Sequence, residues 1–399
     1  MAAWESILMA TMPTVRSTTK ENEMNFKNQS IFRFSVITLV TISLALLVGI
    51  LARSSDAKTK QSSIAHVSLI SNGSGWALTT AGLELTANGG TSFSLVRSPI
   101  PVLNIDDVVV NGTHVSLAGV INSSPIVKSS SDFGASWKSV NLPVGEANAG
   151  GAQFVTQGGI IVGMLVTDVT SSNFSNGEWY ATSDGGLRWT HHLLPAGGVI
   201  TSAGGDLWLA AGPQFASVYR STNLGLTWSK VAIPAATSAN GEALSVPGQL
   251  KNGSVLLVAT KPNVGNASTF AVTVYLSSNK GETWKVLAQT SFVGQISSGV
   301  TAAAAVSDDT IWIGAPTDQS LILISSTGAI SSTSSITGVF AGGSINSIIP
   351  TGSSSAWVTT MKGECPAGKT SCSEIGVLIR TVDSGKSWSR VDLTPKATS

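Results

Sequence analysis

Short runs of alternating apolar and polar residues, separated by small polar turn clusters, fill the chain from about residue 64 to residue 393. Examples are Trp-Ala-Leu-Thr at 76–79, Leu-Trp-Leu-Ala at 207–210, Ile-Trp-Ile-Gly at 311–314 and Trp-Val-Thr-Thr at 357–360. Such alternation between Asn-Gly or Gly-Gly turns is typical of β-hairpins, and it lacks the 3.6-residue period of helical repeats. The pattern predicts an all-β region of short strands.

One eight-residue phrase recurs six times in this region, with the consensus (Ser/Thr)-x-(Asp/Asn)-x-Gly-x-(Ser/Thr/Arg)-(Trp/Phe). Its central residues are Asn88, Asp132, Asp184, Asn223, Asn279 and Asp383. In a tight turn the Asp or Asn side chain accepts backbone N–H bonds, glycine takes a positive φ, and the aromatic residue starts the next strand. Each phrase is therefore expected to form a structural hairpin turn.

The spacing of the phrase sets the size of the repeating unit. Successive central residues are 44, 52, 39, 56 and 104 positions apart, and the last gap has room for a worn copy at 325–328. A second marker shares this period, since turn clusters begin at Asn72, Asn111, Gly158, Gly204, Asn252, Asp308 and Gly352. Units of ~47 residues with four strands are typical of propeller blades. The sequence predicts one seven-bladed β-propeller over residues 64–393, closed without a shared strand.

The phrase resembles the Asp-box, or BNR repeat, of sialidases, sortilin-type receptors, xyloglucan-active glycoside hydrolases and propellers of the photosystem II assembly-factor type. The run at 75–90 is similar to repeats of the assembly-factor type in particular. The resemblance implies a sialidase-like propeller whose boxes lie at the periphery, on the face away from the central ligand site. This chain departs from the pattern, since Asn replaces Asp in three boxes and one box is worn.

The segment before the propeller carries a membrane signal. Residues 34–52 form 19 positions without a charge, long enough as a helix to cross the hydrocarbon of a bilayer. We expect an uncleaved transmembrane anchor, a cytoplasmic tail at 1–33, a tether at 53–63 and a C-terminal tail at 394–399. The alternative is a signal peptide cleaved near 55–57. Translation starting at Met24 would remove residues 1–23.

Two cysteines, Cys365 and Cys372, share a Gly- and Pro-containing loop in the last blade. No histidine lies nearby, so a disulfide is expected rather than a metal site. A structural disulfide indicates an oxidising compartment, which places the propeller outside the cytoplasm and the N-terminus inside. The expected location is the cell membrane with a single pass. Secretion after cleavage is the alternative.

Charge excludes one class of function. The chain has 23 Lys and Arg against 22 Asp and Glu, and only 11% of its residues are charged. A nucleic-acid binder needs an excess of basic residues to neutralise phosphates, so none is expected here. No phosphate loop, dinucleotide fingerprint or zinc spacing is present in the sequence, and no cofactor or metal is expected.

Glycoside hydrolysis needs residues that this sequence does not group together. A sialidase uses three converging arginines, a Tyr/Glu pair and an acidic proton donor. The five propeller arginines are Arg97, Arg188, Arg220, Arg380 and Arg390, and four of them lie beside boxes. The sialidase Phe/Tyr-Arg-Ile-Pro motif is absent, and the run Arg97-Ser-Pro-Ile-Pro101 is only weakly similar to it. The acid pairs 106–107 and 308–309 are expected to be structural or solvated, and the histidines at 191–192 to face opposite sides of a strand.

Binding is expected at the long loops 168–177, 261–268 and 361–374, since recognition concentrates on loops of rigid scaffolds. The candidate contacts are Asp168, Asn173, Lys261, Asn263, Lys362, Glu364 and Lys369. Tolerated insertions are the alternative explanation of these loops. The expected function is a monomeric, membrane-anchored, extracytoplasmic propeller that binds a protein or a surface glycan without catalysis. The alternatives are an assembly or stability factor for a membrane complex and a divergent glycoside hydrolase.

Overall fold

The structure is a computed structural model that describes residues 64–391 with gaps at 70–73, 80, 146–147, 169–176, 212–216, 234–242, 246, 251, 264–265, 294–300, 306–309, 315–319, 340–343, 352–353 and 365–372. The expected tail, membrane segment and tether at 1–63 lie outside the described residues, as do 392–399. Among the described residues, no helix is both long and apolar enough to cross a membrane.

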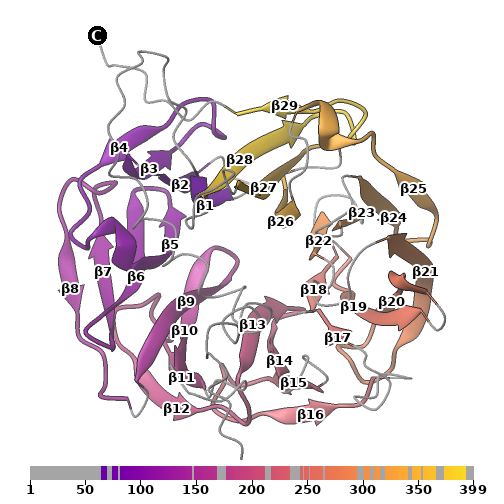
Figure 1. Cartoon of the computed structure of the whole chain (residues 1–399). Helices are drawn as coiled ribbons and strands as arrows, with labels where there is room; N and C mark the ends of the chain where they lie inside the picture. Colours follow the sequence, from indigo (N-terminus) through magenta and orange to yellow (C-terminus); the bar gives the residue numbers. More distant parts are fainter. Residues whose placement is uncertain are drawn as a thin grey trace, which may run out of the picture. The chain divides into compact units, whose positions relative to one another are not determined.

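The described residues form seven antiparallel sheets arranged as the blades of a ring (Figure 1). Blade 1 contains β1 (Ile64–Leu69), β2 (Gly75–Thr79), β3 (Gly82–Thr86) and β4 (Ser94–Val96). Blade 2 contains β5 (Ile105–Asn111), β6 (His114–Ile121), β7 (Ser124–Ser130) and β8 (Lys138–Val140). Blade 3 contains β9 (Ala149–Gln157), β10 (Ile160–Asp168), β11 (Gly177–Ala181) and β12 (Thr190–Leu193). Blade 4 contains β13 (Gly198–Ala203), β14 (Asp206–Ala211), β15 (Ser217–Ser221) and β16 (Ser229–Val231).

The remaining three blades continue around the ring. Blade 5 contains β17 (Ala243–Leu244), β18 (Gly248–Gln249), β19 (Val255–Asn263), β20 (Asn266–Ser277) and β21 (Lys285–Val293). Blade 6 contains β22 (Thr301–Ala305), β23 (Thr310–Gly314), β24 (Leu321–Ser325) and β25 (Ile330–Ser332). Blade 7 contains β26 (Ser344–Pro350), β27 (Ala356–Glu364), β28 (Ser373–Thr381) and β29 (Ser389–Arg390). Short 3-10 helices occupy Val102–Asn104 and Ile336–Gly338.

The predicted all-β, seven-bladed propeller with four-stranded blades is confirmed. Every blade is built from consecutive strands, so no strand is exchanged where blade 7 meets blade 1. In blade 5 the innermost strand is divided into β17 and β18, which both pair with β19.

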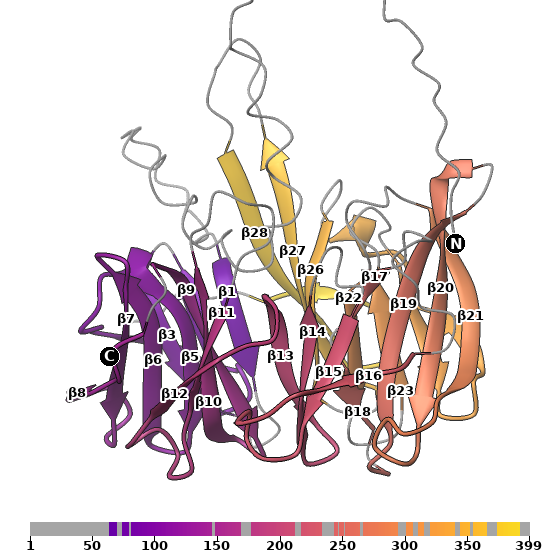
Figure 2. The same ribbon diagram turned by 90° about the horizontal axis from the view of Figure 1, so that it is seen from below.

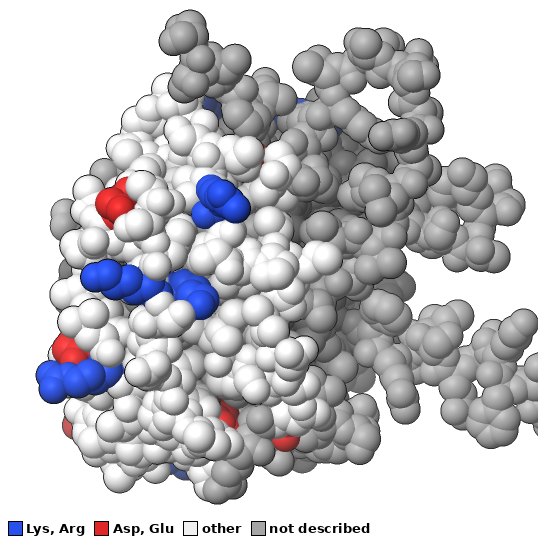
Figure 3. Space-filling model, turned by 90° about the vertical axis from the view of Figure 1, so that its left-hand side faces the viewer, with Lys and Arg blue, Asp and Glu red and all other residues white. Residues whose placement is uncertain are grey.

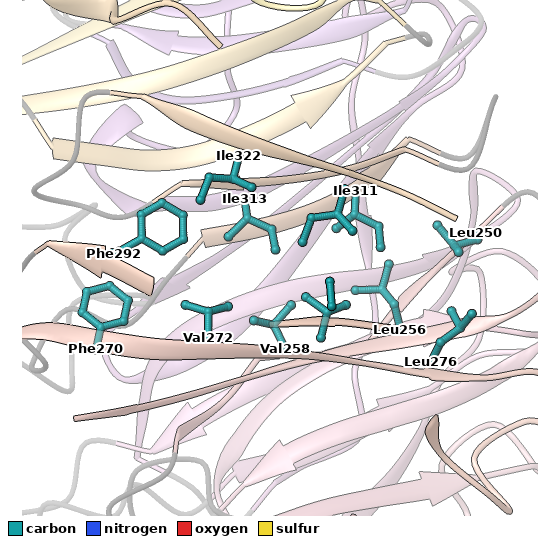
Figure 4. Close-up of a cluster of buried hydrophobic side chains, with 13 residues drawn as sticks. Leu250, Leu256, Val258, Phe270, Val272, Leu276, Phe292, Ile311, Ile313 and Ile322 are labelled. Carbon is teal, nitrogen blue, oxygen red and sulfur yellow. The ribbon is translucent and has the colours of Figure 1, made fainter. Parts of the chain in front are cut away.

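Seven clusters of buried apolar side chains fill the seven interfaces between neighbouring blades. Between blades 5 and 6, aliphatic residues and the stacked rings of Phe270 and Phe292 pack together (Figure 4). Burial of apolar area between sheets is the main stabilising contribution in such a ring. Among the described side chains of the interface between blades 7 and 1, Trp357 of β27 and Phe93 of blade 1 are the largest.

The six repeated phrases, called the repeat turns below, share one set of hydrogen bonds. The first Ser or Thr hydroxyl donates to the Asp or Asn Oδ1 over 2.7–2.9 Å. That hydroxyl also accepts from the glycine N–H over 2.7–3.1 Å. The N–H of the seventh residue donates to the same Oδ1 over 2.8–3.0 Å. The side chains thus satisfy the backbone groups that a tight turn leaves unpaired.

Five of the six repeat turns also lie against the preceding blade, the turn of blade 3 being the exception. A Cβ placed on Gly225 of blade 4 would collide with the Trp179 indole of blade 3, and one on Gly281 of blade 5 with Trp208 of blade 4. The Trp179 Nε1 donates to the Leu224 carbonyl over 2.7 Å. The turns therefore link adjacent blades as well as adjacent strands.

The ring has two distinct faces. The turn face carries the repeat turns and the hairpins between the first two strands of each blade. The loop face, at the opposite end, carries the connections between the second and third strands and the links between blades, and it is uppermost in Figure 2. Because β1 starts at Ile64, opposite Thr79, the chain enters the propeller at the loop face.

Candidate functional site

The sequence candidates lie on three separate blades of the loop face. Asp168 ends β10 of blade 3 and is half-buried, Lys261 and Asn263 are on β19 of blade 5, and Lys362 and Glu364 are on β27 of blade 7. Asn173, Lys369, Cys365 and Cys372 lie outside the described residues. Blades 3, 5 and 7 are not neighbours, so the described candidates are distributed around the loop face.

Two of the three expected loops are partly strand. β19 runs to Asn263 and β20 starts at Asn266, so Lys261 and Asn263 belong to a hairpin rather than to a loop at 261–268. Lys362 and Glu364 pair with β28 across their backbones, so the expected loop 361–374 is also shorter. Pro, Gly and Asn in these segments indicated loops, but cross-strand backbone pairing extends through them with a register shift at Pro262.

A groove of about 760 Å³ opens on blade 1 at the loop face. Its walls are the hairpin at 81–83, the end of β4 and the link at 97–102 that leads into blade 2. Leu95 is 53% exposed there, and Arg97, Pro99 and Pro101 are also exposed. The groove thus presents an aliphatic and proline surface with one cationic side chain.

The local sequence fixes the shape of this groove. The Ser98 hydroxyl donates to the Ile100 carbonyl over 2.7 Å and accepts from the Ile100 N–H over 3.1 Å. Ile100 is buried between blades 1 and 2, and Trp137 Nε1 donates to the Arg97 carbonyl over 3.1 Å. The link at 97–102 is therefore held at both ends and presents a preformed surface, which lowers the ordering cost of binding.

Sequence reasoning did not select this groove. The run Arg97-Ser-Pro-Ile-Pro101 resembles a sialidase motif only faintly, and this resemblance does not predict a groove. Two prolines beside a serine in a link between blades were the available signal, because proline fixes φ and serine stabilises a turn.

Two aspartates, Asp106 and Asp107, lie on β5, the innermost strand of blade 2 (Figure 1). Asp106 Oδ2 accepts from the Ala152 N–H over 3.0 Å, and Asp107 Oδ2 accepts from the Phe154 N–H over 2.8 Å. Consecutive strand residues normally face opposite ways, but the register shift between Ile105 and Asp107 directs both carboxyls to β9 of blade 3. The pair joins blades 2 and 3.

Burial raises the pKa of both acids. Desolvation raises the pKa of Asp106 to about 7, against the lowering effect of the Ala152 hydrogen bond. Desolvation likewise raises the pKa of Asp107 to about 7, with a smaller contribution from the charge of Asp106. A pKa near neutrality is a property that general acids and bases share, but here it results from burial against blade 3, where both carboxyls accept backbone N–H bonds.

A Tyr/Glu pair that the sequence analysis did not identify lies inside blade 3. The Tyr180 hydroxyl donates to Glu178 Oε2 over 3.2 Å, and His191 Nε2 lies 3.1 Å from the same oxygen. Burial, followed by the charge of Glu178, raises the pKa of Tyr180. Tyr180 is fully buried, and Gly145 of the link from blade 2 covers the pair so closely that a Cβ would collide with both side chains. A phenol so enclosed cannot reach a sugar, so the cluster is part of the core.

The arginines beside the repeat turns have partners on their own blades or, for Arg390, on the link that precedes its blade. Arg188 pairs with Asp184 over 2.8 Å, and the Arg220 guanidinium pairs with the buried Asp206 over 2.6 Å. Arg390 Nε donates to the Val339 carbonyl over 2.7 Å, and Arg380 lies over the Trp357 ring. These contacts hold the guanidinium groups at separate positions around the ring.

Charged side chains are sparse on the side of the ring that carries β8. Figure 3 shows a few isolated basic and acidic groups separated by wide uncharged areas. Lys128 and Lys138 belong to the outer strands of blade 2, and Lys128 donates to the Ser139 hydroxyl over 2.7 Å. Recognition by a broad charged surface is not supported on this side.

Comparison with protein-family profiles gives no match, and no curated protein sequence matches the chain. Solved structures do share its fold. "YCF48 bound to D1 peptide" has a TM-score of 0.50 and 16% identity, over 75% of this chain and 89% of that one. An ancestral GH74 enzyme has a TM-score of 0.51 and 12% identity, over 82% of this chain and 54% of that one, so the present chain spans about half of that enzyme.

A virginiamycin B lyase from Staphylococcus aureus has a TM-score of 0.47 and 14% identity, over 82% of this chain and 98% of that one. At these identities the likeness concerns the propeller fold. The peptide-bound YCF48 structure and the GH74 enzyme share this fold, so the fold does not decide activity, which depends on the residues of this chain.

Proposed function

We propose that this chain is a non-catalytic binding or scaffold propeller that holds an extended segment of another protein in the blade 1 groove. The observation that carries the proposal is the preformed surface of Leu95, Arg97, Pro99 and Pro101 at the loop face. Aliphatic and proline surfaces accept apolar side chains of an extended peptide, and an arginine can bind a peptide carboxylate. A surface glycan is the alternative ligand.

The likeness to YCF48, solved with a D1 peptide, supports this proposal at the level of the fold. It also favours the narrower alternative that the bound protein is a subunit of a membrane complex whose assembly or stability this propeller assists. Loss of the chain would then lower the abundance of that complex, which quantitative proteomics of membranes would measure.

The proposal includes the anchor at 34–52 and an extracytoplasmic propeller in which Cys365 and Cys372 form a disulfide. Sequence supports this placement through the uncharged segment and the cysteine spacing. Protease treatment of intact cells should digest the propeller and spare an N-terminal fragment. An N-terminal peptide starting near residue 57 would instead support a secreted protein.

The groove is tested by Leu95→Glu and Arg97→Glu, assayed for partner capture from solubilised membranes. Each should reduce capture about tenfold or more, because a charge in an apolar contact or a reversed ion pair costs roughly 1.4 kcal/mol or more. Leu187→Glu is the matched control, since Leu187 is 71% exposed but lies in a repeat turn at the opposite face. Equal capture by all variants would contradict the proposed site.

A second candidate function, glycoside hydrolysis, is favoured by one observation. Asp106 and Asp107 are adjacent on β5, and burial raises the pKa of both carboxyls to about 7. Turnover of a panel of fluorogenic glycosides that disappears in Asp106→Asn would support an enzyme and would overturn the proposed binding role. Because both carboxyls accept backbone N–H bonds from blade 3, we assign them a structural role.

A further inference from the structure

The described part of the chain ends inside the interface between blades 7 and 1. Val391, its last residue, is 6% exposed and belongs to the apolar cluster that also contains Phe93 and Ala77 of blade 1. The Val391 N–H donates to the Leu378 carbonyl over 2.9 Å, so the backbone pairing of β29 with β28 continues through Val391. The segment that follows therefore starts from a fixed point beside blade 1.

At Val391 the chain runs toward the loop face. β28 runs from the loop face to the repeat turn of blade 7, and β29 returns antiparallel to it. In blade 1, β4 also runs from a repeat turn to the loop face. Leu95 of β4 lies opposite Glu84, which lies opposite Ala77. Directly opposite residues share one face of a sheet, so Leu95 is on the side of blade 1 that faces blade 7.

Leu95 and the blade 1 groove are the next apolar surface along this path. Leu95 comes two residues after Phe93, which is ~7 Å of extended chain. Leu95 is 53% exposed and lines the groove of about 760 Å³. An apolar side chain placed one such step beyond Val391 would therefore reach Leu95.

The sequence after Val391 has an apolar residue at that step. The run Val391-Asp-Leu-Thr-Pro395 alternates apolar and polar positions. In an extended chain this alternation turns Leu393 and Pro395 to the side that Val391 faces. A residue before proline favours extended backbone, and proline is accepted in an edge strand. The eight residues 392–399 span up to ~27 Å, which is enough to follow the groove.

From these features we infer that residues 392–396 lie in the blade 1 groove of their own chain, with Leu393 against Leu95. Leu393 then covers the exposed side chain of Leu95, and Pro395 lies beside the proline-containing link at 97–102. This contact joins blade 7 to blade 1, which share no strand. Burial of apolar area drives the contact, as it does at the interfaces between the other blades.

The expected tether at 53–63 also adjoins blade 1 in the sequence, but it fits the groove less well. The tether leads into β1, the innermost strand, whereas the groove lies beside β4, three strands farther out. Ala57 is the one aliphatic residue of the tether. Its basic residues outnumber its acidic residues by three to one, so the tether would meet like charge at Arg97.

The C-terminal segment then competes with any partner that binds the groove, a consequence that rests on the proposed function. A site that is open for only part of the time binds its partner more weakly in proportion. Lysine in place of Leu393 would leave an apolar groove that also carries Arg97. Leu393→Lys should therefore raise partner capture from solubilised membranes about threefold or more.

The docking is tested by the alkylation rate of a thiol at Leu95→Cys in the full chain, with Cys365→Ser and Cys372→Ser to leave a single thiol. Leu393→Lys should raise this rate about fivefold or more, because it uncovers position 95. Thr394→Lys is the matched control. It should leave the rate unchanged, because the alternation turns residue 394 away from blade 1.

Thermal unfolding of each variant checks that the fold is retained. An alkylation rate that Leu393→Lys does not change, or that Thr394→Lys raises equally, would overturn the inference. Protection of the thiol that grows with protein concentration would assign the segment to a second copy and would also overturn it. Partner capture is measured separately. Faster alkylation in Leu393→Lys without a rise in capture would support the docking and contradict the proposed function of the groove.

Discussion

Asparagine and aspartate are interchangeable in the repeat turns because the neighbouring hydroxyl can reverse its role. In the Asn223 turn, Nδ2 donates to the Thr227 hydroxyl over 2.9 Å. In the Asp383 turn, the Ser387 hydroxyl donates to the carboxylate over 2.6 Å. A hydroxyl is both donor and acceptor, so the turn keeps its bonds with either residue. The three Asn copies therefore keep the turn geometry.

Replacing Asn223 with alanine should lower the free energy of unfolding by about 1 kcal/mol. The variant leaves the Ser221 hydroxyl and the Thr227 N–H without their shared acceptor. Asn223→Asp is the matched control and should be close to neutral. Chemical denaturation followed by tryptophan fluorescence measures both, and equal losses for the two variants would contradict this account of the turn.

Asp106 should make the stability depend on pH. Its folded pKa, raised from 3.8 to about 7, means that the native state holds more protons than the unfolded state between about pH 4 and pH 7. Stability is then greatest below pH 4 and falls as pH rises through that window. Asp106→Asn keeps an acceptor for the Ala152 N–H and should gain about 1–2 kcal/mol at pH 8.

Denaturation of wild type and Asp106→Asn at pH 5 and pH 8 measures the effect. The free energy of unfolding of Asp106→Asn should exceed that of the wild type by a larger amount at pH 8 than at pH 5. An advantage that is the same at both pH values would show that the carboxyl is ionised in the native state throughout this range.

At the scale of elements, the repeat turn is a contact between blades. Gly225 has a φ of +83° and lies on the Trp179 indole, and Gly253 has a φ of +84° with open space beside it. The two glycines share a backbone conformation but differ in their surroundings. Comparing them separates backbone strain from packing.

Gly225→Ala should therefore destabilise the protein by about 3 kcal/mol or more, because a methyl group would displace the buried Trp179 ring. Gly253→Ala should cost only about 1 kcal/mol, the strain of a left-handed alanine. Thermal unfolding with near-ultraviolet circular dichroism of the tryptophans measures both. If the two costs are equal, the turn does not lock blade 4 onto blade 3.

The sequence predicted the presence and order of the strands better than the residues at which they end. The repeat-turn sequence predicted the positions of the hairpins, because its Ser or Thr, Asp or Asn and Gly residues form the turn through contacts within a few positions of the chain. The ends of β19, β20, β27 and β28 could not be predicted, because extension past Pro262 or Gly363 depends on pairing with a neighbouring strand. The sequence predicted that the candidate residues of β19 and β27 lie at the loop face, where the structure has them, but it assigned to loops several residues that are in strands.

At the scale of the whole molecule, the ring closes where blade 7 packs against blade 1. The sequence indicated this kind of closure because the last blade has its own fourth strand and blade 1 its own first strand. At this closing interface the described apolar side chains include Ala77 and Phe93 of blade 1 and Trp357 of blade 7. The fully buried Glu84 pairs with Ala77, and its carboxylate accepts from the Thr79 hydroxyl over 2.9 Å. Burial raises the pKa of Glu84. Blades 7 and 1 are thus joined by apolar side-chain packing and by the repeat turn at Gly90 of blade 1, which lies against the Trp357 indole of blade 7.

The blade 1 groove could not be predicted, because it forms where a hairpin, an outer strand and a link between blades meet in space. Only the proline-containing link is local in sequence. The same holds for Asp106 and Asp107, whose shared direction results from a bulge and whose partners lie on the next blade. Such sites depend on the ring as a whole.

The most direct test of the binding role is photo-crosslinking in native membranes from a reactive amino acid at position 95, compared with position 187. The account predicts that position 95, in the groove, crosslinks one specific protein and that position 187, at the turn face, does not. Crosslinking of the same protein from both positions, or from position 187 alone, would contradict it.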